Sequence, residues 1–197
     1  MKNIAILGST GSIGTQALDI VERFPDKFQI ISLVANRNVQ LLRDQIKKFK
    51  PEFVVVSDEK NAEILSKQVD IKVFAGEENI VTAATDHRVD MVINSLVGKS
   101  GLLPTIEAIK LGKEIGLANK ETLVLAGNIV MQLAKKHNVS IIPIDSEHCA
   151  LFQSLRSGAH HEIQRLILTM GKGPIAGMDK RRLSTVSMQD VLDRPYW

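Results

Sequence analysis

The chain is poor in the residues that would place it outside the cell or in a membrane. It has one cysteine among 197 residues, so it cannot form an internal disulfide, which is typical of proteins from a reducing compartment. No apolar run approaches the roughly 18 residues of a membrane-spanning helix, and the first residues lack the charged and apolar regions of a signal peptide. We therefore expect a cytoplasmic protein that has no membrane partner.

An excess of charge of one sign is also missing. The 25 Lys and Arg residues are dispersed among 22 Asp and Glu residues, which gives a net charge of only +3. The one basic run, Lys180-Arg181-Arg182, is far shorter than the basic stripe of a typical nucleic-acid-binding protein. This distribution argues against nucleic acid as a partner and suits a small anionic ligand.

Short apolar segments alternate with segments whose apolar residues recur at helical spacing. The expected strands are 4–7, 28–34, 53–56, 91–94, 115–118 and 140–144, with a short additional strand at 73–74. The expected helices between them are 15–23, 39–49, 61–68, 102–111 and 121–136. Strict alternation of strand and helix predicts an α/β fold, a Rossmann-like doubly wound parallel sheet with helices on both faces.

The pattern changes after residue 144. Residues 146–155 and 187–192 have helical spacing, residues 163–169 resemble a strand, and residues 170–180 form a glycine-bearing loop. This stretch is too short to build a core of its own. We expect a first domain over residues 1–144 and the beginning of a second α/β domain, incomplete, over residues 145–197.

A glycine-rich loop, Gly8-Ser-Thr-Gly-Ser-Ile-Gly14, stands between the first expected strand and the first expected helix. Glycine lets the backbone turn tightly and approach a diphosphate closely, and the free amides at the start of a helix bind anions. The hydroxyl groups of Ser9, Thr10 and Ser12 would add donors. The alternative is a turn without a ligand, but the strand–loop–helix context favours dinucleotide binding.

The end of the second expected strand distinguishes the two nicotinamide dinucleotides. Sites for NAD usually have an acidic residue here, whereas the 2′-phosphate of NADP requires a cation. The sequence reads Val34-Ala-Asn-Arg-Asn38, without an acid, and Arg37 can bind a phosphate through two donors. The alternative for Arg37 is a solvated surface side chain. We predict NADPH as the cofactor.

Two further motifs follow strands that end at the same edge of the sheet. Asn119 and Lys120 either contact a ligand there or serve as a helix N-cap and an exposed first-turn residue. Asp145 and Glu147 are hard oxygen donors suited to Mg²⁺ or Mn²⁺. The same two acids also fit an N-cap and a first helical turn favoured by the helix dipole.

Taken in order, these motifs resemble the 1-deoxy-D-xylulose 5-phosphate reductoisomerase family. The segments that carry the resemblance are Gly8–Gly14, Gly101-Leu-Leu-Pro-Thr105, Leu117-Ala-Asn-Lys-Glu121 and Pro143-Ile-Asp-Ser-Glu-His148. The resemblance implies an oxidoreductase and isomerase that converts 1-deoxy-D-xylulose 5-phosphate to 2-C-methyl-D-erythritol 4-phosphate in non-mevalonate isoprenoid synthesis. A divalent metal would assist rearrangement of the sugar phosphate to an aldehyde, which NADPH would reduce. Family members are typically homodimers, so a homodimer is one expectation.

The resemblance also implies roles for individual residues. The residues that would bind the NADPH phosphates are Thr10, Gly11, Ser12 and Ile13. Those that would hold the adenosine ribose and its 2′-phosphate are Asn36, Arg37 and Asn38. The cofactor site would continue at Asn119 and Glu121. The residues that would contact the substrate are Lys120, Ser146 and Glu147, and the ligands of Mn²⁺ or Mg²⁺ would be Asp145 and Glu147.

The sequence departs from the family pattern after residue 168. Gly171 stands where the family has a serine that helps bind the substrate phosphate, with Lys172 beside it as a compensating cation, and Arg194 replaces a substrate-binding histidine. The family's third metal-ligating glutamate and its C-terminal helical domain are absent from these 197 residues. We therefore expect poor turnover, or none, by this chain alone, as a fragment or a shortened relative. Two other functions stay open: an NADPH-binding module without catalysis, and a different NADP-dependent Rossmann reductase.

Overall fold

The computed structural model describes residues 1–169 and 173–192. It divides into two compact units, Met1–Asp145 and Ser146–Trp197. No helix in the described ranges is long and apolar enough to cross a membrane.

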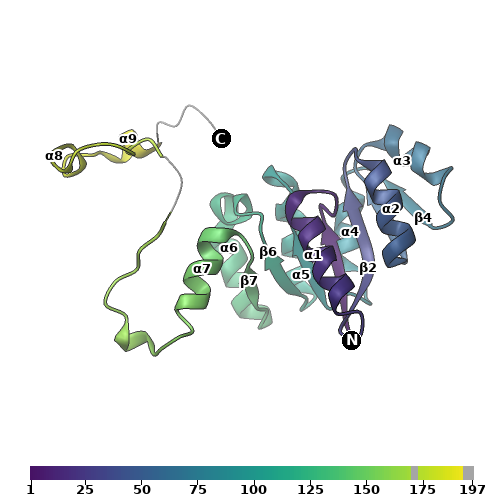
Figure 1. Ribbon diagram of the computed structural model, residues 1–197, viewed down its shortest axis with the longest axis horizontal. Coiled ribbons are helices and arrows are strands. Elements are labelled where there is room, and N and C mark those ends of the chain that lie inside the picture. The colour runs from purple at the N-terminus through teal and green to yellow at the C-terminus, as the bar shows by residue number, and fades with distance from the viewer. Residues whose placement is uncertain (170–172, 193–197) are drawn as a thin grey trace. The chain divides into compact units, whose positions relative to one another are not determined.

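The first unit is built on a seven-stranded sheet in the order β4-β3-β2-β1-β5-β6-β7 (Figure 1). Every neighbouring pair of strands is parallel. The strands are β1 (Lys2–Leu7), β2 (Phe28–Ala35), β3 (Phe53–Val56), β4 (Lys72–Ala75), β5 (Met91–Asn94), β6 (Glu114–Leu117) and β7 (Ile141–Pro143). The predicted doubly wound parallel sheet is confirmed, including the short strand at 73–74, which is part of β4.

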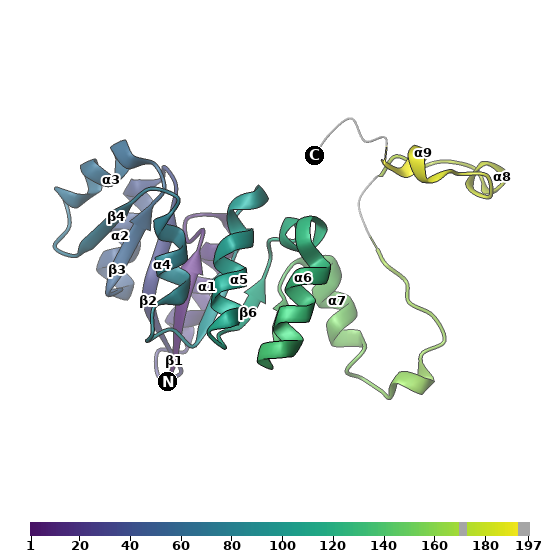
Figure 2. The same ribbon diagram turned by 180° about the vertical axis from the view of Figure 1, so that it is seen from behind.

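Helices cover both faces of this sheet. The helices on one face are α1 (Ser12–Arg23), α2 (Val39–Phe49) and α3 (Glu59–Ser66). Those on the other face are α4 (Asn79–Thr85), α5 (Leu102–Lys110) and α6 (Glu121–His137). Helices α1 and α2 lie in front of the sheet in Figure 1, and α4, α5 and α6 lie in front in Figure 2. A short 3₁₀ helix, Gly98–Gly101, precedes α5.

The central strand β1 supplies both halves of the core. Because successive side chains of a strand point to opposite faces, Ile4 and Ile6 pack with α1 and α2, whereas Ala5 and Leu7 pack with α4 and α5. Ile6 and Leu7 are fully buried. A strand buried on both faces has to be apolar throughout, which explains why β1 shows no polar alternation after Asn3.

Helix α4 was not expected from the sequence. Its residues, Asn79-Ile-Val-Thr-Ala-Ala-Thr85, include four β-branched side chains, a composition that favours strands over helices. Burial explains the outcome, because Ile80, Ala83 and Ala84 contact the sheet and are at most 2% exposed. Tertiary packing of an apolar face therefore outweighs local propensity.

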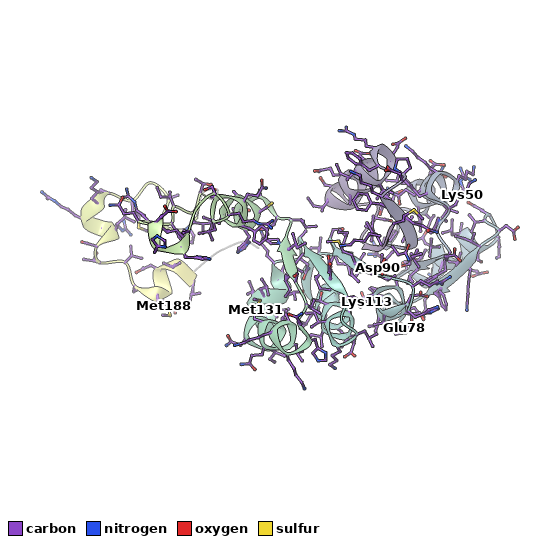
Figure 3. The ribbon with its side chains drawn as sticks, turned by 90° about the horizontal axis from the view of Figure 1, so that it is seen from below. Lys50, Glu78, Asp90, Lys113, Met131 and Met188 are labelled. Carbon is purple, nitrogen blue, oxygen red and sulfur yellow. The ribbon has the colours of Figure 1, made fainter. Side chains whose placement is uncertain are left out.

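A buried lysine, Lys113, stabilises the loops at the amino-terminal ends of the strands. The ammonium group of Lys113 donates hydrogen bonds of 2.7 Å to the backbone oxygens of Asp86 and Val89. Burial lowers the pKa of Lys113, and hydrogen bonds from the Arg88 side chain lower the pKa of Asp86 to about 2. Figure 3 looks onto this edge, with Lys113 and Asp90 labelled. These contacts hold the connections that lead into β5 and β6.

The second unit contains short helices in its described part. They are α7 (Ser146–Ser154), a 3₁₀ helix (His160–Glu162), α8 (Lys180–Leu183) and α9 (Met188–Leu192). The prediction of a strand at residues 163–169 is wrong, because these residues have no regular structure. The apolar side chains of Leu166, Ile167 and Leu168 are more than half exposed. A strand needs a hydrogen-bonded neighbour, and the sequence pattern alone could not show whether residues 163–169 have one.

Candidate functional site

The strand order reverses direction between β1 and β5. From β1 the chain crosses to β2 on one side, and from β5 it crosses to β6 on the other. In open parallel sheets, ligands bind outside the carboxyl ends of the strands at such a reversal. The loops that meet there are 8–11, after β1, and 95–97, after β5. The predicted phosphate loop therefore lies at the point where this fold class binds ligands.

The loop after β1 is held in a tight turn. Gly8 has a φ of +88°, a conformation that favours glycine. The backbone amides of Gly8 and Ser9 both donate to the backbone oxygen of Val34, at 2.9 and 2.8 Å. A Cβ on Gly8 would lie 2.8 Å from the backbone oxygen of Ser95. The turn is therefore tied to β2 and pressed against the loop after β5.

The other two glycines of the motif have different surroundings. A Cβ on Gly14 would lie 2.2 Å from the oxygen of Gly8 and 2.6 Å from the Cα of Ser9. Gly11, the N-cap of α1, has only the Gly8 oxygen nearby, at 3.4 Å. Gly14 is thus required for α1 to pack against the loop, whereas Gly11 leaves an open surface at the helix N-terminus, where amides have no intrahelical acceptor.

Ser9 does not face that open surface. Its side chain is fully buried, and its hydroxyl donates to Oε1 of Gln45 at 2.8 Å. The expectation that Ser9 offers its hydroxyl to a ligand is therefore wrong. Gly11 and Ser12 are exposed, and Thr10 is half-buried. The Ser12 hydroxyl accepts a hydrogen bond from the Gln16 side chain at 3.1 Å.

Arg37 lies on the loop between β2 and α2 with an 80% exposed side chain. Its nearest acidic partner is Asp58, whose carboxylate lies 3.9 Å from Nε of Arg37. The Asn61 backbone amide holds the pKa of Asp58 below its usual value, with a smaller contribution from Arg37. Asn38 caps α2 by accepting a hydrogen bond from the Leu41 amide at 3.2 Å. The guanidinium group of Arg37 is thus accessible beside the start of α2.

The side chain of Asn119 is used inside the protein. It is 1% exposed, and its Nδ2 donates to the backbone oxygens of Leu96 and Gly98 at 2.8 and 2.9 Å. Its Oδ1 accepts from the amide and hydroxyl groups of Thr122. This is the helix-capping alternative, combined with support of the loop after β5. Beside it, Lys120 is exposed and Glu121 half-buried at the start of α6.

Asn94 supports the same loop and was missed by the sequence analysis. Its buried Nδ2 donates to the Gly101 oxygen at 2.9 Å and to the Thr105 hydroxyl at 2.8 Å. A Cβ on Gly101 would lie 2.7 Å from that amide nitrogen and 2.8 Å from Cγ of Asn119. The available signal was a single polar residue at the end of an apolar strand. Together Asn94 and Asn119 fix residues 95–101 beside the phosphate loop.

The two predicted metal ligands follow β7. Asp145 is the last residue of the first unit, and Glu147 lies in the first turn of α7, where its carboxylate accepts from the Ser146 hydroxyl at 2.8 Å. Among the described residues, no three His, Cys, Asp or Glu side chains form a group that could hold a metal ion. Two carboxylates are nevertheless a donor set that Mg²⁺ accepts, with water and substrate oxygens completing its shell.

Three further predicted positions cannot be placed. Gly171, Lys172 and Arg194 lie outside the described residues.

The parallel sheet with its glycine loop at the strand reversal defines an α/β protein of the Rossmann-like class. A sequence model of 1-deoxy-D-xylulose 5-phosphate reductoisomerase matches residues 4–127, and one of the C-terminal domain of that enzyme matches residues 141–197. The chain belongs to the 1-deoxy-D-xylulose 5-phosphate reductoisomerase family. The resemblance carried by the sequence motifs is confirmed.

Individual relatives agree with this assignment. The 1-deoxy-D-xylulose 5-phosphate reductoisomerase of Geotalea uraniireducens is 46% identical over 200 residues, which cover all of this chain and 52% of that protein. The enzyme of the same name from Clostridium perfringens is 45% identical over 202 residues, covering all of this chain and 53% of that protein. The chain thus spans about half the length of the curated relatives it matches.

Solved structures of the same enzyme also match. The Zymomonas mobilis enzyme in complex with NADPH has a TM-score of 0.80 and 34% identity, and the match covers 98% of this chain and 52% of that one. A second structure, in complex with NADPH, fosmidomycin and magnesium, has a TM-score of 0.77 and 33% identity, covering 100% of this chain and 52% of that one.

We predict that Gly14→Ala lowers the free energy of unfolding by about 2 kcal/mol or more, because the new methyl group meets rigid backbone. Helix propensity alone would favour alanine by about 1 kcal/mol, so a decrease in the free energy of unfolding can be attributed to the clash. The control is Gly11→Ala, which should change stability by no more than about 1 kcal/mol. Urea denaturation followed by circular dichroism measures both. Equal losses in the two variants would contradict the geometry.

Proposed function

We propose that this chain provides the NADPH-binding part of a reductoisomerase that converts 1-deoxy-D-xylulose 5-phosphate to 2-C-methyl-D-erythritol 4-phosphate with a divalent metal. The observation that carries the proposal is the phosphate loop at the reversal of strand order between β1 and β5, with Arg37 exposed on the loop after the neighbouring strand β2. Family membership and the NADPH and magnesium complexes of the matching structures support it. Family membership also supports a cytoplasmic location and a homodimer for the whole protein.

The two parts of the chain take different roles in this proposal. Residues 1–144 form the NADPH-binding domain, and residues 145–197 begin the catalytic domain. The matched residue ranges of the two family models, 4–127 and 141–197, support this division.

The proposed cofactor site uses three kinds of contact. The backbone amides of Thr10, Ser12 and Ile13 donate to the diphosphate at the N-terminus of α1, where the helix dipole favours an anion. The amide of Gly11 donates to the Gly8 oxygen at 3.1 Å, so Gly11 contributes by leaving room for the diphosphate. Arg37 pairs with the 2′-phosphate, and Asn36 and Asn38 flank the adenosine ribose. Asn119 acts on the cofactor through residues 96–98, which it supports, while Glu121 borders the site. NADPH, when bound, supplies a hydride, and the protein residues orient the ring that carries it.

The residues proposed to contact the substrate and the metal follow β6 and β7 in the chain. Asp145 and Glu147 would hold Mn²⁺ or Mg²⁺, which polarises a substrate carbonyl when it is bound. Lys120 offers an exposed ammonium group to the anionic sugar phosphate. Ser146 donates its hydroxyl to Glu147, so it both orients that carboxylate and can contact substrate. An ammonium group suits the phosphate of a phosphorylated sugar, and a metal held by two carboxylates suits its neighbouring oxygens.

Binding of the two dinucleotides to the 197-residue chain tests the cofactor assignment. We expect NADPH to bind more tightly than NADH, and Arg37→Ala to weaken NADPH binding by about tenfold or more, the worth of a charge-assisted hydrogen bond. NADH affinity should stay unchanged. The matched control is Arg23→Ala, which removes an exposed arginine at the far end of α1. Unchanged NADPH affinity in Arg37→Ala would overturn this role.

Mn²⁺ binding, measured from the electron paramagnetic resonance signal of the free ion, tests the metal assignment. We expect Asp145→Asn and Glu147→Gln each to weaken Mn²⁺ binding by at least about tenfold, since even outer-shell changes have effects of that size. Asp26→Asn, an exposed carboxylate in the α1–β2 loop, serves as the control. Equal Mn²⁺ affinity in all variants would contradict the assignment.

A further inference from the structure

A buried polar pair joins the phosphate loop to helix α2. The hydroxyl of Ser9 donates to Oε1 of Gln45 at 2.8 Å, and Nε2 of Gln45 donates to the backbone oxygen of Ser9 at 2.9 Å. Ser9 is fully buried, and Gln45 is 5% exposed. The two residues are 36 positions apart in the chain, so the link connects separate elements of the fold.

The two ends of this link lie on the two elements next to the proposed anion sites. Ser9 is part of the loop proposed to bind the diphosphate. Gln45 is on α2, which begins at Val39, two residues after Arg37, and is capped by Asn38. The loop is also bonded to β2 through the oxygen of Val34, but that contact is backbone only. The side chain of Gln45 joins the phosphate loop to α2, the helix that follows Arg37.

The environment of Gln45 holds its side chain in one position. The other buried residues of α2 are Leu42 and Ile46, which pack into the hydrophobic core between the helix and the sheet. A buried amide is costly unless it is hydrogen-bonded, and the two bonds to Ser9 use both an acceptor and a donor. Sliding or rotation of α2 relative to the loop would break both bonds together.

We propose that Gln45 is a positioning residue that sets the separation between the diphosphate loop and Arg37, and so favours a dinucleotide with a 2′-phosphate. The inference rests on the proposed function. NADPH would engage both anchors at once, so its affinity depends on their spacing. NADH would use the diphosphate loop without the phosphate contact at Arg37, so it tolerates a shift of α2 better. Loss of the link should therefore reduce selectivity for NADPH over NADH.

The test compares dissociation constants for NADPH and NADH in the 197-residue chain. Gln45→Met keeps an unbranched side chain of similar length and removes the amide. We expect the NADPH preference to fall by about fivefold, the effect of roughly one net hydrogen bond. The matched control is Gln132→Met, an exposed position on α6, which packs on the other face of the sheet. Its selectivity should equal that of the wild type.

A second variant keeps the inference testable if Gln45→Met does not fold. Ser9→Ala removes the hydroxyl and leaves the Gln45 bond to the Ser9 backbone oxygen, so it should lower the NADPH preference in the same direction by a smaller factor. Thermal melts report whether each variant is folded. Equal weakening of NADPH and NADH would show a purely structural role, and an unchanged preference in folded variants would overturn the inference.

The outcomes also separate this inference from the proposed function. If the wild-type chain binds no NADPH, the proposed function fails, and the positioning role fails with it. If the wild type prefers NADPH and loses that preference in Arg37→Ala but not in Gln45→Met or Ser9→Ala, the cofactor assignment stands and only the role of Gln45 is wrong.

Discussion

The close turn after β1 is the constraint on which the rest of the structure depends. Gly8 takes a positive φ, and the amides of Gly8 and Ser9 converge on one backbone oxygen of β2. The start of α1 lies so near this turn that a Cβ at position 14 would clash with the backbone of Gly8 and Ser9. The N-terminus of α1 follows this turn directly, and the first amides of a helix together with the positive end of its dipole favour an anion.

The surrounding loops are built to preserve that geometry. Buried side-chain amides do this work on both sides of the turn: Gln45 holds it from α2, and Asn94 and Asn119 hold residues 95–101 next to it. Each is almost fully buried with its hydrogen bonds made inside the protein. Because a buried amide without partners is costly, such a network permits one arrangement of the loops. Arg37 and Lys120, in contrast, are exposed.

The sequence predicted the sheet and its loop well, because both leave strong local patterns. Apolar segments such as 53–56 and the glycines of residues 8–14 are signals that hold in almost any context. The predictions for helix α4 and for residues 163–169 were wrong. Burial decides the first, and in the described part of the chain no strand pairs with residues 163–169. The orientation of Ser9 and the role of Asn94 could not be predicted from the sequence either. They depend on partners distant in sequence, which a single chain does not reveal.

A crystal structure of the 197-residue chain with NADPH tests the central claim most directly. The diphosphate should lie against the amides at the N-terminus of α1, and the 2′-phosphate should lie within hydrogen-bonding distance of the Arg37 guanidinium group. NADPH bound away from the carboxyl ends of β1 and β5, or with its 2′-phosphate directed away from Arg37, would contradict the account.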